Sequence, residues 1–165
     1  MRAPARYRLL LAILALLAAA GCQQASPPDG KPLVVASFYP MYEFARQVAG
    51  DRARVVSLVP TGAEPHDWEP SPQDMAEIRR ARLFVYNGAG LEPWAEKVKA
   101  ELDAKTTAVV SASARIPLVG KDPHVWLDPT LARSEVEAIR AALTQIDPGG
   151  AALYEIGRAS CRERV

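Results

Sequence analysis

The regular alternation of short apolar runs with amphipathic helical stretches is the feature that most limits how this chain can fold. Four mostly apolar runs, at residues 33–37, 54–59, 83–87 and 107–110, have the length of strands. Between these runs, and again after the last one, apolar residues recur at helical spacing. This order is typical of a parallel sheet with helices on both faces. The sequence therefore predicts an α/β fold, a parallel sheet flanked by helices.

The only two histidines of the chain stand in loops of similar sequence. His66 occurs in Pro-His-Asp-Trp-Glu-Pro (65–70) and His124 in Pro-His-Val-Trp-Leu-Asp-Pro (123–129). In both loops a proline precedes the imidazole, a tryptophan follows two residues later, and an acidic residue stands directly before the next proline. The similarity indicates that the two imidazoles share one role, and the simplest shared role is metal coordination.

The predicted fold allows both loops to lie beyond the carboxyl ends of the parallel strands. His66 follows the second predicted strand, and His124 lies downstream of the fourth. Because ligands of parallel sheets bind beyond the carboxyl ends of the strands, both imidazoles can face the same crevice. Two imidazoles do not complete a zinc site, which usually has four ligands. A hydrogen-bonded structural role remains the alternative for each histidine taken alone.

The N-terminus has the pattern of a bacterial export signal. Three arginines precede a 12-residue apolar run at 9–20, and Ala-Gly-Cys follows with Cys22 at its end. The run is short for a bilayer span, which takes about 20 residues. We interpret residues 1–21 as a lipoprotein signal peptide, Cys22 as the acylated mature N-terminus, and residues 22–32 as a polar tether. An ordinary secretory signal with an incidental cysteine is the alternative.

Composition and charge exclude some classes of function. The chain has 165 residues, 49% of them hydrophobic, and a formal net charge of +1. Three of its 20 basic residues lie in the leader, so the rest of the chain has 17 basic and 19 acidic residues. A nucleic-acid-binding protein needs a clustered basic face, and none is present. Cys161 is the only other cysteine, so acylation of Cys22 would leave no intramolecular disulfide.

The two histidine loops also carry a resemblance to a known family. Residues 62–72 and 123–129 resemble the two metal-ligand motifs of the zinc- and manganese-binding solute-binding proteins of ABC transporters. The resemblance runs from about Leu33 to Tyr154. It implies a protein of two α/β lobes joined by a long helix, with Zn²⁺ or Mn²⁺ held between the lobes. His66 and His124 would then be the metal ligands of the first lobe.

The resemblance also implies a domain layout. Residues 33–146 correspond to the N-terminal lobe and residues 147–154 to the start of the connecting helix, while the second lobe and its ligands are absent from this sequence. Residues 155–165 continue no helical or strand pattern. We interpret them as a tail outside the family, either a frayed terminus or foreign, artefactual sequence.

The function implied by the resemblance is transport rather than catalysis. Such a protein captures a divalent transition metal on the periplasmic or outer side of a membrane, to which a lipid anchors it, and delivers the metal to an ABC transporter permease. Two alternatives remain, an exported zinc metallohydrolase and a surface adhesin on the same fold. The chain has no His-Glu-x-x-His or Gly-x-Ser-x-Gly motif that would favour a hydrolase, so we expect no enzyme.

Overall fold

A four-stranded parallel sheet is the centre of the computed structural model, which describes residues 30–118 and 120–162. The strands lie in the order β2-β1-β3-β4. Val34 of β1 pairs with Val55 of β2 on one side and with Leu83 of β3 on the other. The predicted α/β fold is confirmed. The strands are β1 (Leu33–Ala36), β2 (Arg54–Ser57), β3 (Leu83–Tyr86) and β4 (Ala108–Ser111).

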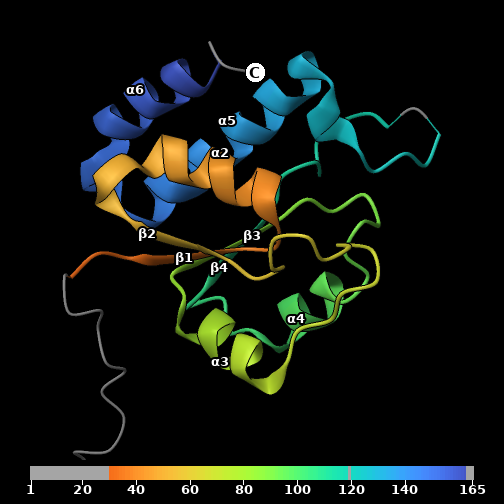
Figure 1. Cartoon of the computed structure of the whole chain (residues 1–165). Coiled ribbons are helices and arrows are strands. Elements are labelled where there is room, and N and C mark those ends of the chain that lie inside the picture. The colour runs from red at the N-terminus through yellow and green to blue at the C-terminus, as the bar shows by residue number, and fades with distance from the viewer. Residues whose placement is uncertain (1–29, 119, 163–165) are drawn as a thin grey trace, which may run out of the picture.

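Helices cover both faces of the sheet (Figure 1). The α-helices are α2 (Tyr39–Ala49), α3 (Pro72–Arg80), α4 (Ala95–Glu101), α5 (Pro129–Ile146) and α6 (Ala151–Arg162), with 3₁₀ turns at η1 (Gly50–Arg52), η2 (Val125–Leu127) and η3 (Pro148–Gly150). The core splits into two clusters because side chains alternate between the faces of a strand. Val34 and Val85 pack with α2, α5 and α6, whereas Val35 and Phe84 pack with α3 and α4.

The two helices that follow the histidine loops begin at similar capping residues. Ser71 accepts a hydrogen bond from the backbone N–H of Asp74, whose carboxylate accepts one from the Ser71 N–H. Asp128 accepts from the N–H groups of the second and third residues of α5. A proline follows each cap at the first helical position, where its missing N–H costs nothing. These caps set where each histidine loop ends.

Helix α6 corrects the prediction that no element exists beyond residue 154. The helix continues to Arg162, and Tyr154 and Cys161 are buried in it. A Cβ on Gly157 would lie only 2.5 Å from the carbonyl oxygen of Val48, so glycine allows α6 to lie directly against α2. The sequence pattern missed this helix because three small residues and an arginine, at 157–160, interrupt its apolar residues. Whether residues 155–165 are native to the protein stays a prediction.

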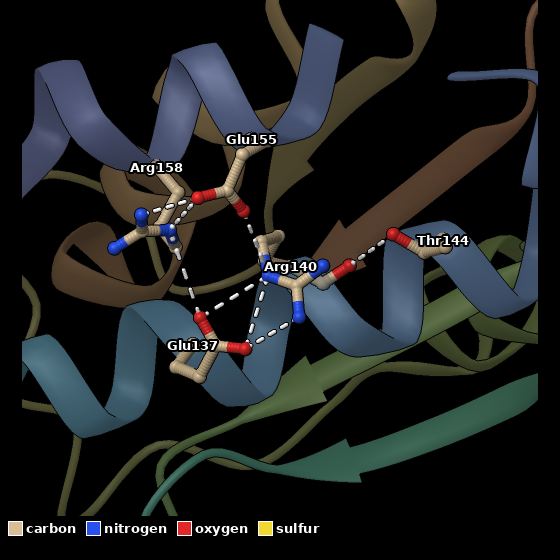
Figure 2. A network of polar contacts seen from close by, with 5 residues as sticks. All are labelled: Glu137, Arg140, Thr144, Glu155 and Arg158. Atoms are coloured by element: carbon tan, nitrogen blue, oxygen red, sulfur yellow. Dashed lines mark hydrogen bonds and ion pairs between the residues drawn. The ribbon is translucent and has the colours of Figure 1, made fainter. Parts of the chain in front are cut away.

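Ion pairs also connect α6 to α5. Figure 2 shows Glu137 and Arg140 of α5 facing Glu155 and Arg158 of α6. Arg140 lies 3.6 Å from Glu155, and Arg158 lies 3.8 Å from Glu137, while each arginine also pairs with the glutamate on its own helix. The glutamates are about half exposed. Solvent therefore weakens these pairs, and the apolar contacts of α6 contribute more to its packing.

The leader and Cys22 lie outside the described residues, so the lipidation prediction has no structural counterpart. Within residues 30–118 and 120–162, no helix is both long and apolar enough to cross a membrane.

Candidate metal centre

The structure brings His66 and His124 together although 58 positions separate them in sequence. Their Nε2 atoms are 3.2 Å apart, and the ring planes meet at 58°. His66 lies in the loop between β2 and α3, and His124 lies in the loop between β4 and α5. Both loops leave the carboxyl ends of their strands, as the predicted sheet required. Both imidazoles are exposed to solvent.

The separation of the two Nε2 atoms fits a shared metal ion. Two nitrogens at 2.0–2.1 Å from a tetrahedral zinc lie about 3.3 Å apart. The observed 3.2 Å therefore requires little movement of either ring. In the part of the chain that the structure describes, no group of three or more His, Cys, Asp or Glu side chains could hold a metal. The described residues therefore bring two imidazoles together on an open surface.

Asp122 orients the His124 ring. Its Oδ1 lies 2.7 Å from His124 Nδ1 and accepts a hydrogen bond of 3.0 Å from the His124 backbone N–H. These hydrogen bonds, the backbone one first, hold the pKa of the Asp122 carboxyl below its usual value. An ionised carboxylate at Nδ1 favours the tautomer that carries the proton there, which leaves Nε2 free to bind a metal. Sequence reasoning missed Asp122, although its position two residues before the histidine was a usable signal.

The acidic residue near His66 has a different place. Glu64 accepts a hydrogen bond of 3.4 Å from the backbone N–H of His66, and no contact joins its carboxylate to the His66 ring in the described structure. The Glu64 side chain is exposed and supports the loop backbone.

The tryptophans that follow each histidine are packing residues. Trp126 meets Phe38 edge to face with ring centroids 4.9 Å apart, and its ring lies 5.2 Å from that of His124. Trp68 meets Trp94 edge to face at 5.3 Å. Each tryptophan thus connects its loop to the core, and Trp126 also touches the histidine ring itself.

A buried carboxyl pair, which sequence reasoning missed, lies on the interior side of the His124 loop. Glu92 is 3% exposed and Glu135 of α5 is fully buried. Glu92 accepts three hydrogen bonds, whereas neither oxygen of Glu135 has a partner in the described structure. Burial, with a smaller contribution from the charge of Glu92, raises the pKa of Glu135 to about 8. Burial raises the pKa of Glu92 as well, but its hydrogen bonds from Ser37, Asn87 and Gly88 act in the opposite direction, and Glu135 has no such hydrogen bonds in the described structure.

Comparison with known families finds matches to metal-uptake proteins. The family model described as zinc-uptake complex component A, periplasmic (ZnuA) matches residues 34–165. Among curated relatives, the high-affinity zinc uptake system protein ZnuA of Bacillus subtilis is 39% identical over 141 residues, which cover 74% of this chain and 44% of that protein. The manganese-binding lipoprotein MntA of Halalkalibacterium halodurans is 36% identical, over 90% of this chain and 52% of that protein.

A solved structure of a related protein has a similar fold. The chain is similar to the Zn(II)-bound ZnuA-like domain of AdcA from Streptococcus pneumoniae, with a TM-score of 0.78 and 40% sequence identity. That match covers 82% of this chain and 52% of the other. The chain thus spans about half the length of the relatives it matches.

Proposed function

We propose, because this chain belongs to the ZnuA family of periplasmic zinc-uptake components, that it captures a divalent transition metal, zinc or manganese, outside the cytoplasm and delivers it to an ABC transporter permease. In this role the metal is cargo rather than a resident cofactor. His66 and His124 are the two ligands that this lobe contributes. The relatives named for zinc and for manganese support either metal as the cargo.

The observation that carries the proposal is the 3.2 Å separation of the two Nε2 atoms. Imidazole is a common ligand for zinc, and Asp122 supplies the outer hydrogen bond that metal-bound histidines usually make. Both rings are exposed, so a metal ion and further ligands can reach them without unfolding the lobe. The family is a transport component rather than an enzyme family, and this supports binding without turnover.

A calorimetric titration of the whole chain with Zn²⁺ and Mn²⁺ tests this site. We expect one site per chain, and we expect His66→Ala and His124→Ala each to weaken it by at least the roughly 10–100-fold that outer-shell changes cost. Affinity should also fall as the solution is acidified, because protons compete with the metal for imidazole. Glu101→Gln, an exposed change on α4, is the matched control. Unchanged affinity in the double histidine variant would refute the assignment.

We also propose that Cys22 is acylated and holds the protein on the outer side of a membrane. The apolar run and the Ala-Gly-Cys sequence support this, as do relatives named as lipoproteins. Mass spectrometry of the membrane-bound protein should detect no peptide from residues 1–21. An unmodified Cys22 peptide as the main species would contradict lipidation.

A further inference from the structure

Few hydrogen bonds connect the His124 loop to the sheet, and one of them comes from a buried asparagine. The Nδ2 of Asn87 donates to the carbonyl oxygen of Pro123 at 3.0 Å. Pro123 directly precedes His124, so this bond fixes the backbone from which the His124 ring projects. Asn87 follows β3, 36 positions earlier in the sequence, and is fully buried.

The orientation of the Asn87 amide follows from its surroundings. Nδ2 donates both to Pro123 and to the carbonyl of Gly88 at 2.9 Å, whereas Oδ1 has no partner in the described structure. The reverse assignment would turn Oδ1 towards two carbonyl oxygens, which repel it. The two hydrogen bonds that Nδ2 donates, rather than the unpaired Oδ1, therefore hold this buried amide in its orientation.

Contacts on three sides hold the Asn87 backbone in place. Its N–H donates to Oε1 of Glu92 at 2.9 Å, and the neighbouring Gly88 N–H donates to Oε2 at 3.0 Å. Ser37, at the end of β1, donates to the same Oε1 at 2.6 Å. The Asn87 carbonyl accepts from the backbone N–H of Ser113 at 3.0 Å and from its hydroxyl at 2.7 Å. Asn87 therefore connects the ends of β1, β3 and β4 to the His124 loop.

We propose that Asn87 is a positioning residue for His124, because its amide fixes the Pro123 carbonyl and so sets the distance of the His124 ring from His66. The proposal rests on the proposed function, since the distance matters for cargo only if the two rings bind metal. Glu92 acts one step further away by holding the backbone of Asn87 and Gly88. Neither residue touches the metal ligands' rings.

The test compares Asn87→Ala with Thr107→Val in the whole chain. Thr107 is buried at the opposite end of β4, where its hydroxyl donates to the Ala81 carbonyl at 2.8 Å. Asn87→Ala loses two buried side-chain hydrogen bonds to backbone carbonyls and Thr107→Val loses one, but only Asn87→Ala affects the His124 loop. The readouts are the NMR signals of the His124 ring in the metal-free chain, the absorption spectrum of bound Co²⁺, and zinc affinity.

We expect Asn87→Ala to shift and broaden the His124 ring signals, to change the Co²⁺ spectrum, and to weaken zinc binding by about tenfold. Thr107→Val should lower the unfolding midpoint and leave all three readouts unchanged. His124 signals and zinc affinity in Asn87→Ala equal to those of Thr107→Val would overturn the proposal. If the parent chain bound neither zinc nor cobalt, the proposed function would fail, whereas the metal-free ring signals would still decide the role of Asn87.

Two further measurements cover the case in which Asn87→Ala does not fold. Asn87→Ser keeps a small polar group whose hydroxyl is too short to reach Pro123, and the same shifts are expected from it. In the unmutated chain, the side-chain amide protons of Asn87 should exchange slowly with solvent and show contacts to Pro123. Rapid exchange without such contacts would overturn the proposal whatever the variants do.

Discussion

The two histidine loops resemble each other in sequence but are held in different ways. In the His124 loop, Asp122 binds both the ring and the backbone of the histidine, and Asn87 binds the carbonyl just before it. In the described His66 loop, His66 itself makes one hydrogen bond, of 3.4 Å from its backbone N–H to Glu64, apart from the approach of the two rings, and the loop backbone adds bonds from Ala63 to Pro60 and from Asp67 to Glu64.

This difference indicates that the two imidazoles have unequal roles. The His124 ring is oriented before a metal arrives, because its Nδ1 is already bound to a carboxylate. The His66 ring receives no comparable support in the described structure, so it can adjust to the metal. If the comparison is right, changes around His124 should cost more than matched changes around His66.

The largest expected effect concerns the interior side of the His124 loop, where Glu135 faces Glu92. The pKa of Glu135 is raised from 4.5 to about 8 in the folded chain, so the folded state binds its proton more tightly than the unfolded state does. The free energy of unfolding should therefore fall as the pH rises from 4.5 to about 8, by up to about 5 kcal/mol. Glu135→Gln should remove most of this decline, as denaturant titrations across that pH range would show.

Glu137→Gln is the control for that measurement. Glu137 stands two residues along the same helix but is exposed and paired with Arg140. The Glu137→Gln variant should show nearly the same dependence of unfolding free energy on pH as the parent chain. The same decline with pH in Glu135→Gln as in the parent would show that Glu135 is not the titrating group. The helix that follows the His66 loop, α3, has no buried titratable group to compare with Glu135, because Ile78 is its only buried residue in the described structure.

The next largest effect is expected on zinc affinity, when the acidic residue two positions before each histidine is replaced. Asp122→Asn removes the charged acceptor at His124 Nδ1 and should weaken zinc binding roughly 10–100-fold. Glu64→Gln removes only a long contact to the backbone and should change zinc affinity by less than about threefold, under 1 kcal/mol for an exposed contact. Calorimetry on the two variants measures both values. Equal losses would mean that the loops are supported alike, against the comparison above.

A smaller effect concerns the caps at which the two loops end. Asp128→Ala and Ser71→Ala should each lower the free energy of unfolding by about 1 kcal/mol, because each leaves helix N–H groups without their acceptor. The variants should differ in the NMR signals of the histidine rings. Asp128 stands four residues from His124, next to the short η2 turn, and its loss should shift the His124 signals. Unshifted His124 signals would show that the cap stabilises α5 alone.

The smallest effect lies away from both loops, in the ion pairs between α5 and α6. Arg158→Ala should change the free energy of unfolding by less than about 1 kcal/mol, because its glutamate partners are about half exposed. Thermal unfolding measures this, with metal affinity expected to stay at the parent value. A loss of several kcal/mol would show that α6 depends on these pairs rather than on its apolar contacts.

Local patterns in the sequence were sufficient for the elements of the fold. The four strands lie close to the predicted apolar runs, and helices occupy the stretches where apolar residues recur at helical spacing, because each element depends on residues within a few positions. Helix α6 was missed because its packing depends on a glycine against α2 rather than on a continuous apolar stripe.

The two metal-ligand candidates were also accessible from the sequence, because the loops repeat one pattern around scarce residues. The strand order β2-β1-β3-β4 decides whether those loops meet, and the tertiary structure brings the two Nε2 atoms to 3.2 Å. Their role as metal ligands stays a prediction, which the titrations above test.

The sequence by itself determined the α/β class and the two histidine loops. Only the tertiary structure decided which polar side chains support His124. Asn87 and Pro123 are 36 positions apart, and Glu92 and Ser37 are 55 apart, so no local pattern connects them. Glu135 would be read as one more surface charge on α5, but it is fully buried where that helix packs on the sheet. Burial and long-range hydrogen bonds arise only when the strands are assembled, and those two properties give otherwise ordinary residues their roles.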